Sequence, residues 1–152
     1  MAAASVWTRK AGGNDAVYVE RFIDRARHIE VQVLGDGGDA PVHLWERECS
    51  LQRRNQKLVE VAPSPTLSED TRQQLLDAAL RLAAKVGYRS LGTFEFLVDA
   101  DESRFAFIEA NPRLQVEHTV TEEITGVDLV QAQLRVAGGA SLSDLGLTRP
   151  PQ

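Results

Sequence analysis

The sequence has few of the residues that build disulfide frameworks, zinc sites or membrane spans. Only one of its 152 residues is a cysteine, Cys49, so no internal disulfide can form and no zinc site can be built from cysteine spacing. A lone cysteine also favours the cytoplasm as the compartment. No apolar run approaches the roughly 20 residues of a membrane helix. Residues 1–13 also lack the apolar core of a secretory signal.

The chain also lacks the positive charge that general nucleic-acid or anionic-membrane binding requires, since its net charge is −5. Its hydrophobic content of 43% and charged content of 26% are ordinary for a globular protein, and 152 residues fit one domain. Four of its positively charged residues lie close together in one stretch, namely Arg47, Arg53, Arg54 and Lys57. Such a cluster is more often a solvated surface, but it also offers a local anion site.

The first 50 residues have the pattern of an antiparallel meander. Residues 17–23 are rich in β-forming residues, and residues 27–34 alternate apolar and polar side chains, as a half-buried strand does. A glycine-rich turn at 35–38 separates this strand from a return strand at 42–48. We expect these strands to pair in sequence order.

A long helix is predicted after the break at Pro63-Ser64-Pro65. Thr66 or Ser68 can cap a helix that starts near Glu69, and Gly87 stands where a C-terminal cap belongs. An apolar stripe at helical spacing lies between them: Leu75, Leu76, Ala79, Leu80, Ala83 and Val86.

The second half of the chain predicts a hairpin and one more helix. Strands at 93–98 and 104–109 are joined by an acidic turn at 99–102. A helix is expected from Asp128 to about Ala137, ended by two glycines, and residues 144–152 with their prolines read as a tail.

Polar side chains occupy every odd position from 109 to 117, namely Glu109, Asn111, Arg113, Gln115 and Glu117. The even positions carry Ala, Pro, Leu and Val. Because side chains alternate faces in extended backbone, an extended segment would line one surface with five polar groups over ~27 Å. Pro112 favours that geometry at Asn111. An edge strand with one wet face produces the same alternation.

A second carboxylate indicates a metal site. Glu95 lies in the middle of a predicted strand between two phenylalanines, and pairing of the hairpin would bring it beside Glu109. Adjacent carboxylates repel each other, and a bridging divalent cation removes that repulsion. Hard oxygen ligands select Mg²⁺ or Mn²⁺, and Asn111 offers a third oxygen. The alternative is a pair of exposed glutamates. The basic stretch at 47–57 would supply cations for phosphoryl chemistry beside the metal.

Residues 46–57, 92–96 and 107–118 together closely resemble the biotin carboxylase family of ATP-grasp ligases. Residues 27–32 and 125–128 are similar to it as well, so the resemblance runs from about Val17 to Leu145. It implies an α+β fold, the C-terminal lobe of an ATP-grasp enzyme, with a mostly antiparallel sheet and flanking helices. We expect a ragged N-terminal segment at 1–16, the lobe at 17–140 and a C-terminal tail at 141–152.

The resemblance also implies a reaction and roles for individual residues. In this family ATP phosphorylates bicarbonate, carboxyphosphate breaks down to CO₂, and biotin takes it up. By resemblance Glu117 is the general base, Arg113 stabilises the anionic intermediates, and bicarbonate is held by Lys57, Arg113, Gln115 and the Val116 backbone. Two Mg²⁺ or Mn²⁺ ions would be held by Glu95, Glu109 and Asn111. Positions that match ATP contacts are Glu20, Arg21, Ile23, His28, Gln52, Asn55, Glu95 and Glu109.

The sequence departs from the family pattern in several places. Asn55 stands where many relatives have a histidine, and an amide can donate a hydrogen bond there but cannot carry charge. Nothing before Val17 resembles the family's N-terminal domain or its glycine-rich lid, and the segment with the biotin-engaging arginine does not follow. The only methionine is Met1, so no Ala-Met-Lys-Met biotinylation motif is present. We therefore expect part of an enzyme, inactive by itself, with biotin on another domain or protein.

Two other interpretations stay open. Another ATP-grasp ligase, of the carbamoyl-phosphate synthetase class, would share the metal and ATP residues but not the whole stretch at 113–118. A non-catalytic remnant would fold and associate with a partner, such as the remaining carboxylase segments. The final carboxyl acceptor can be an acyl-CoA, pyruvate or urea.

Overall fold

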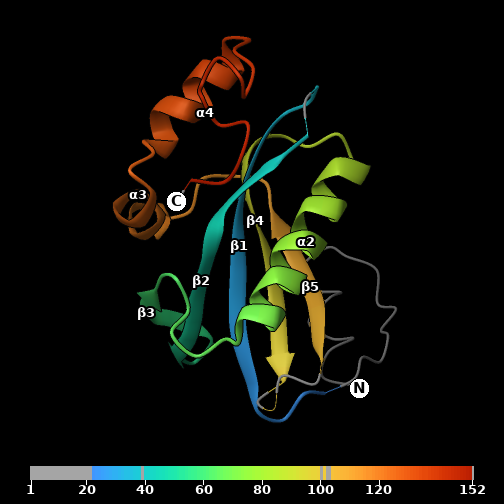
Figure 1. The fold of residues 1–152 in the computed structure, drawn as a ribbon. Coiled ribbons are helices and arrows are strands. Elements are labelled where there is room, and N and C mark those ends of the chain that lie inside the picture. The colour runs from blue at the N-terminus through green and yellow to red at the C-terminus, as the bar shows by residue number, and fades with distance from the viewer. Residues whose placement is uncertain (1–21, 39, 100, 102–103, 152) are drawn as a thin grey trace, which may run out of the picture.

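The computed structural model describes residues 22–38, 40–99, 101 and 104–151. These residues form five strands and three helices (Figure 1). The strands are β1 (Ala26–Asp36), β2 (Val42–Arg53), β3 (Gln56–Val61), β4 (Arg89–Asp99) and β5 (Phe105–Asn111). The helices are α2 (Glu69–Lys85), α3 (His118–Thr125) and α4 (Leu129–Ala137). The expected α+β fold with an antiparallel sheet and flanking helices is confirmed.

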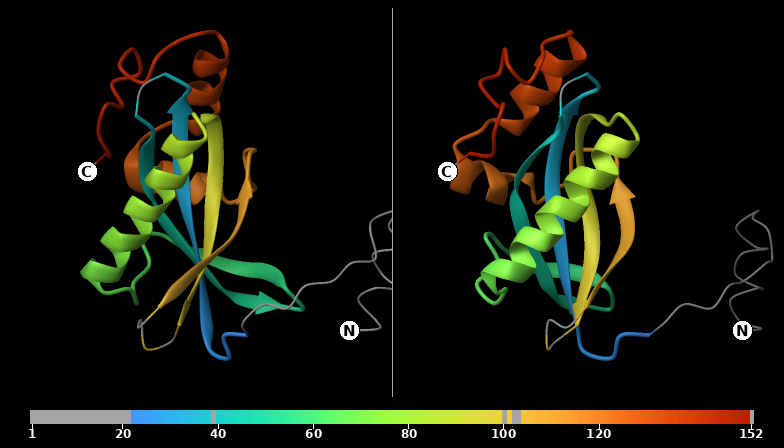
Figure 2. Two further views of the ribbon diagram at one scale, coloured as in Figure 1. Left: turned by 90° about the vertical axis from the view of Figure 1, so that its right-hand side faces the viewer. Right: turned by 45° about the vertical axis from the view of Figure 1, so that its right-hand side comes forward.

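The strands form one antiparallel sheet in the order β3-β2-β1-β4-β5. The expected pairing of the strand at 27–34 with the return strand at 42–48 and the hairpin of β4 with β5 are confirmed, and Glu95 lies opposite Glu109. Figure 2 shows the sheet twisted, with α2 lying along one of its faces. The long central strand β1 therefore has one face towards α2 and one face away from it.

Helix α2 begins and ends close to the predicted residues. Of the two candidate caps, Ser68 is the N-cap, and its side chain accepts a hydrogen bond from the backbone of Thr71. Gly87 follows the helix with a left-handed φ of 57°. Val86, assigned to the apolar stripe, is wrong in that role, because it is the C-cap and is 69% exposed.

The main core lies between α2 and the sheet. The buried helix residues Leu75, Leu76, Ala79 and Ala83 pack against β1 and β4 residues that share one face: Ile29, Val31, Val33, Phe94, Phe96 and Val98. Full burial of a side chain of this kind contributes about 1.5–3 kcal/mol. Packing of α2 against the sheet therefore stabilises the strands that carry the residues on the opposite face.

A second core lies at the other end of the sheet, under α4. Leu142 and Leu147, from the segment expected to be a tail, are buried there with Leu34 and Leu44. The indole nitrogen of Trp45 donates a hydrogen bond to the carbonyl of Pro151 at 2.9 Å. Residues 141–151 therefore pack on the lobe, although the domain limits at 16 and 140 stay predictions.

One expected strand boundary needs correction, one helix was not expected, and part of one expected strand lies outside the described residues. Strand β2 does not end at Glu48 but continues to Arg53, and β3 returns beside it after a turn in which Arg54 and Asn55 are left-handed, with φ of 54° and 62°. Helix α3 was not predicted. Residues 17–21 of the first expected strand, with Glu20 and Arg21, lie outside the described residues. No helix in the described part of the chain is long and apolar enough to span a membrane.

Candidate active site

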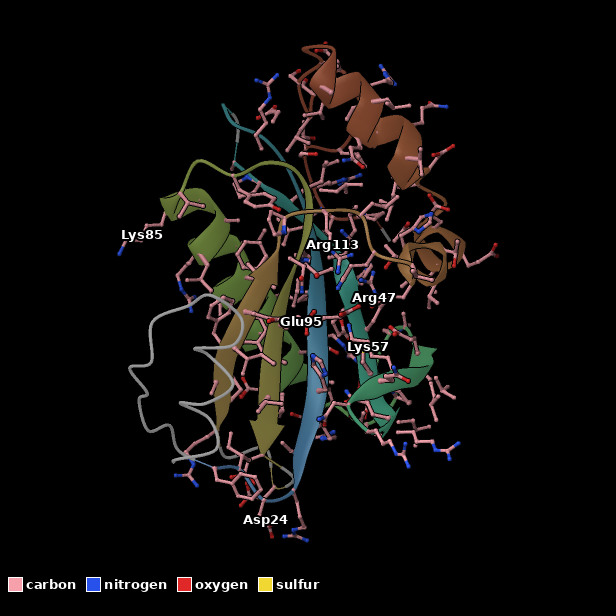
Figure 3. All side chains as sticks on the ribbon, turned by 180° about the vertical axis from the view of Figure 1, so that it is seen from behind. Asp24, Arg47, Lys57, Lys85, Glu95 and Arg113 are labelled. Atoms are coloured by element: carbon pink, nitrogen blue, oxygen red, sulfur yellow. The ribbon has the colours of Figure 1, made fainter. Side chains whose placement is uncertain are left out.

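A polar cavity lies on the face of the sheet that α2 does not cover. It has a volume of about 340 Å³ and is lined by His28, Asn55, Lys57, Glu95, Glu109, Asn111, Arg113, Gln115, Val116 and Glu117. Figure 3 shows Lys57, Glu95 and Arg113 gathered over the middle of this face. All five polar residues of the odd-numbered pattern line the same cavity, as the sequence predicts.

The backbone reaches this arrangement in a different way from the one expected. Strand β5 ends at Asn111, and the chain then turns, with the backbone nitrogen of Arg113 donating to the carbonyl of Asn111 at 2.9 Å. The prediction of an extended segment up to Glu117 is therefore wrong. Residues 112–117 fold back over the sheet, and this brings Gln115, only 7% exposed, into hydrogen-bond contact with Glu95 at 3.3 Å.

Glu95, Glu109 and Asn111 converge on one point. The amide nitrogen of Asn111 donates to the Oε1 atoms of Glu95 at 2.7 Å and of Glu109 at 3.1 Å. The amide therefore lies between two carboxylates, and rotation of its side chain by half a turn would present its oxygen to the same point. Two carboxylates and one amide oxygen are ligands that Mg²⁺ and Mn²⁺ prefer. The residues present thus fit a hard divalent cation.

His28 holds Glu95 from the side away from Asn111. Its Nε2 atom lies 2.6 Å from Glu95 Oε2, and its Nδ1 atom lies 2.8 Å from the amide nitrogen of Gln52. Since an amide nitrogen only donates, this arrangement fits the tautomer with the proton on Nε2. Burial works to raise the pKa of Glu95, but the hydrogen bond from His28 and the charge of Lys57 outweigh it and lower that pKa to about 2. Glu95 is therefore ionised at neutral pH, as a metal ligand must be.

Lys57, on β3, lies at the centre of the carboxylates. Its Nζ atom is 2.5 Å from Glu30 Oε2, 2.8 Å from Glu117 Oε1 and 3.6 Å from Glu95 Oε1. Burial opposes the charge of Lys57, but the hydrogen bonds with Glu117 and Glu30 hold its pKa above the ordinary value. Burial likewise works to raise the pKa of Glu117, and the hydrogen bond from Lys57 outweighs it and lowers that pKa. Both groups are therefore charged at neutral pH.

Two buried residues beneath the cavity were not singled out as site residues. The guanidinium of Arg47 donates to Glu30 Oε1 at 2.6 Å, and neither side chain has any exposed surface. The interpretation of residues 27–34 as a half-buried strand is therefore wrong, because Glu30 and Gln32, on its polar face, are both buried. Opposite charges at Glu30 and Arg47, on neighbouring strands, are the signal that could have revealed the pair. The basic cluster is divided too, since Arg54 is exposed and Arg47 is not.

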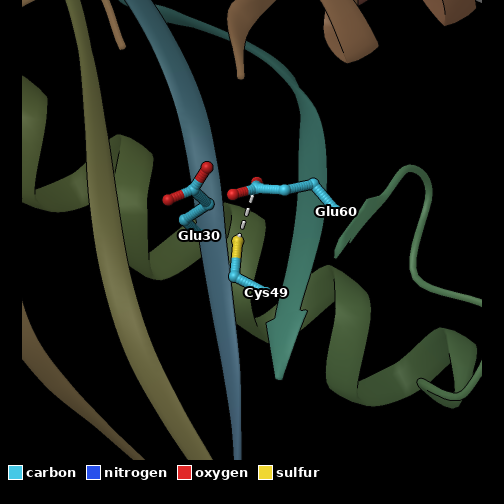
Figure 4. Close-up of side chains that lie close together, drawn as sticks. All are labelled: Glu30, Cys49 and Glu60. Carbon is cyan, nitrogen blue, oxygen red and sulfur yellow. Dashed lines mark hydrogen bonds between the residues drawn. The ribbon is translucent and has the colours of Figure 1, made fainter. Parts of the chain in front are cut away.

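Glu30, Cys49 and Glu60 lie together beside this pair, with potential ligand atoms within 4.8 Å of one another (Figure 4). The thiol of Cys49 donates to Glu60 Oε2 at 3.1 Å. Burial and the negative charge of Glu30 raise the pKa of the thiol, so it stays protonated, whereas a metal-bound thiol must lose its proton. Arg47 and Lys57 already neutralise Glu30. The group is therefore a hydrogen-bonded part of the core.

The remaining candidates divide between the cavity and its surroundings. Asn55 lines the cavity from the β2–β3 turn, whereas Gln52 reaches the site through His28. Ile23 lines a different cavity, of about 430 Å³. Thr93, which sequence reasoning did not select, donates to Gln115 Oε1 at 2.6 Å and so orients the amide that faces Glu95.

Comparisons with known proteins agree with this geometry. A family model described as "Carbamoyl-phosphate synthase L chain, ATP binding domain" matches residues 1–145. Pyruvate carboxylase of Aspergillus niger is 58% identical over 141 residues, which are 93% of this chain and 12% of that protein. The chain thus spans about one eighth of the length of this relative.

Solved biotin carboxylase structures share both sequence and fold with the chain. The biotin carboxylase domain of a single-chain bacterial carboxylase is 62% identical, with a TM-score of 0.82 over 87% of this chain and 30% of that one. Biotin carboxylase of Campylobacter jejuni, in a complex described as β,γ-ATP, is 46% identical, with a TM-score of 0.87 over 92% of this chain and 31% of that one.

The biotin carboxylase domain of a thermophilic 2-oxoglutarate carboxylase, described as bound to bicarbonate, is 47% identical, with a TM-score of 0.81 over 93% of this chain and 32% of that one. The matches therefore cover most of this chain at high identity and similar fold. The chain belongs to the family of carbamoyl-phosphate synthase L chain ATP-binding domains, and within it to the biotin carboxylase type.

Proposed function

We propose that this chain forms the ATP-, metal- and bicarbonate-binding face of a biotin-dependent carboxylase. One observation carries the proposal: a single cavity holds two cations and an amide, Lys57, Arg113 and Gln115, beside the carboxylates Glu95 and Glu109 and the ionised Glu117. A relative described as bound to bicarbonate and one described as an ATP complex support it. A cytoplasmic location remains a prediction.

Glu95, Glu109 and Asn111 would hold Mg²⁺ or Mn²⁺, which when bound neutralises charge on the phosphates of ATP. His28, supported by Gln52, keeps Glu95 ionised and fixed in direction. Asn55, at the rim of the cavity, can donate a hydrogen bond to a phosphate oxygen. These residues orient the terminal phosphate towards Lys57 and Glu117.

Bicarbonate, an anion, would bind between Lys57, Arg113 and the amide of Gln115, with the Val116 backbone at the edge of the cavity. Glu117 accepts the bicarbonate proton, and the bicarbonate oxygen attacks the γ-phosphorus of ATP as the bond to ADP breaks. The hydrogen bond from Lys57 keeps Glu117 deprotonated at neutral pH, so it can act as a base. Carboxyphosphate then breaks down to CO₂ and inorganic phosphate, and N1 of biotin, on another domain or protein, takes up the CO₂ as its proton passes to the released phosphate. The positive charge of Arg113 stabilises the anionic intermediates.

Binding of bicarbonate is the direct test. We would titrate ¹³C-bicarbonate into the chain with Mg²⁺ and ADP present and follow the bicarbonate linewidth by NMR. Arg113→Ala and Lys57→Gln should abolish the line broadening, whereas Arg54→Ala, an exposed arginine of the β2–β3 turn, should leave it unchanged. Equal broadening with all three variants would contradict the proposal.

Carboxylation activity of the 152-residue chain assayed by itself is a separate question from bicarbonate binding. Carboxyphosphate is short-lived in water, so its use requires a lid that excludes solvent. Loss of one positioned donor alone lowers rates by about 10²–10³, and the chain spans 30–32% of the solved biotin carboxylase domains. We expect weak nucleotide–metal binding and no detectable carboxylation of free biotin. Turnover that Glu117→Gln abolishes would refute this expectation.

Two measurements separate the alternatives. In an active complete enzyme, a ligase of the carbamoyl-phosphate synthetase class would hydrolyse ATP with bicarbonate but without dependence on biotin. A non-catalytic remnant would bind neither bicarbonate nor a metal–nucleotide complex. The identity of 46–62% to solved biotin carboxylases favours the biotin-dependent reaction over both.

A further inference from the structure

Arg47, on β2, is a fully buried guanidinium at the junction between the sheet and α3. It donates to Glu30 Oε1 at 2.6 Å, to Gln32 Oε1 at 2.9 Å and to the hydroxyl of Thr121 at 2.7 Å. A buried charge is tolerated only where good partners satisfy it, so these contacts define one position for the side chain. The planar guanidinium reaches all three partners at once from two of its nitrogens, in a fixed fork that the single nitrogen of an ammonium group does not reproduce.

Two routes lead from Arg47 to Glu117. In the first, Glu30 accepts from Arg47 through Oε1 and from Lys57 through Oε2, and Lys57 in turn donates to Glu117. In the second, Thr121 lies one helical turn after Glu117 on the same segment and has no exposed surface. One route sets the direction of the Lys57 ammonium, and the other sets the position of the backbone that carries Glu117.

Helix α3 depends on such an anchor. It has eight residues, which is far below the ~12–15 residues that an isolated helix needs. Its N-cap, Glu117, makes no side-chain capping hydrogen bond, because its carboxylate is turned to Lys57 instead. The helix therefore relies on contacts with the sheet, and the hydrogen bond from Arg47 to Thr121 is one of them.

We propose that Arg47 is a positioning residue that holds Glu117 at its place in the cavity, through Thr121 on one side and through Glu30 and Lys57 on the other. The proposal rests on the proposed role of Glu117 as the base. It predicts that loss of the Arg47–Thr121 contact moves α3 and weakens the Lys57–Glu117 pair while the rest of the sheet stays folded.

The test uses the 152-residue chain without ATP, metal or bicarbonate, so its outcome is independent of the bicarbonate-binding test. Thr121→Val removes the hydroxyl at nearly constant volume, and Thr121→Ser restores it. Thr119→Val makes the same change at an exposed position of the same helix. Arg47→Lys keeps a charge beside Glu30 but removes the planar fork; if that variant does not fold, the Thr121 series still decides.

Two measurements test whether loss of the Arg47–Thr121 contact moves α3 and weakens the Lys57–Glu117 pair. Amide hydrogen exchange in α3 should be at least about tenfold faster in Thr121→Val, since a hydrogen bond to a charged group is lost. A ¹³C NMR titration of the Glu117 carboxyl should show its pKa rising towards the ordinary value, because Lys57 no longer pairs with it fully. Arg47 and Glu60 also interact electrostatically with Glu117, and Thr121→Val retains both charges while it removes the hydroxyl to which Arg47 donates.

Thr121→Ser and Thr119→Val should both behave as the unmodified chain does. The proposal is overturned if Glu117 titrates in Thr121→Val as it does in the unmodified chain, even when α3 exchanges faster, because Thr121 would then support the helix only. It is equally overturned if Thr119→Val produces the same changes as Thr121→Val.

Discussion

The two faces of the sheet are both buried along β1, but by different means. Towards α2 the strand presents Ile29, Val31 and Val33, which a helix covers. Away from α2 it presents His28, Glu30 and Gln32, and two of these three are almost fully buried as well. The face towards α2 is buried because a helix covers its apolar side chains. The other face is buried because its charged side chains pair with one another.

The difference decides how each face tolerates change. Apolar burial is non-directional, so a core substitution that conserves volume usually costs less than about 1.5 kcal/mol. The polar face depends on directed hydrogen bonds, such as those that join Arg47, Glu30 and Lys57, and removal of one partner leaves another charge buried. The first face supports the fold, and the second holds reactive groups in defined positions.

The largest expected effect is on the apolar face. Phe96 is 1% exposed and makes edge contacts with Phe105 and Phe107, so Phe96→Ala should lower the free energy of unfolding by about 3–5 kcal/mol. Phe107→Ala removes the same ring from an edge position that is 46% exposed, and its loss should be clearly smaller. Urea denaturation measures both. Equal losses would mean that the covered face is not the main source of stability.

The next effect should appear on the polar face as a dependence on pH. The pKa of Glu95 is lowered to about 2, so its contribution to stability is complete above about pH 4.5 and is lost as the pH falls towards 2. Without divalent metal, acidification from pH 6 to pH 3 should therefore remove about 2 kcal/mol through this group.

Glu95→Gln should flatten that part of the acid dependence in urea denaturation at several pH values. Glu123→Gln, at an exposed position of α3, serves as the control and should retain the full slope. An unchanged slope in Glu95→Gln would mean that His28 and Lys57 do not stabilise the Glu95 carboxylate.

A smaller effect, in binding rather than stability, is expected at the metal ligands. Asn111→Ala should weaken Mn²⁺ binding in the presence of ADP at least about tenfold, because it removes the group between Glu95 and Glu109. Electron paramagnetic resonance measures free Mn²⁺ directly. Gln73→Ala, at an exposed position of α2 on the opposite side of the sheet, should bind Mn²⁺ normally. Normal binding by Asn111→Ala would remove Asn111 from the metal site.

The smallest effect is expected where an apolar residue lies on the polar side. Val116 lines the cavity but is 91% exposed, so Val116→Ser should change the free energy of unfolding by less than about 0.5 kcal/mol. The same substitution at Val31, which has no exposed surface, should cost about 2 kcal/mol or more. Similar losses at both positions in thermal unfolding would break the distinction between the two faces.

Much of the architecture could be predicted because it depends on local pattern. The alternation at 27–34 gave β1, the serine cap and apolar stripe gave the limits of α2, and Asp128 with its glycine stop gave α4. The hairpin of strands 93–98 and 104–109 was predicted as well, but Glu95 lies opposite Glu109 because the register shifts between Glu95 and Phe96, a β-bulge that the spacing of the strands does not show. Each of these elements is specified by residues close together in the chain.

The sequence by itself determined where most of the strands and helices lie, and its motifs were specific enough to indicate the family. Only the tertiary structure decided which faces are covered: that Glu30 and Arg47 are buried, that residues 112–117 turn back over the sheet, and that α3 forms on that turn. The periodicity of apolar residues and the secondary-structure propensities of single residues reflect interactions between residues that are close together in the chain. Burial of a charge depends on partners such as Thr121, 74 residues from Arg47, which the chain brings near only when the sheet and α3 have packed together.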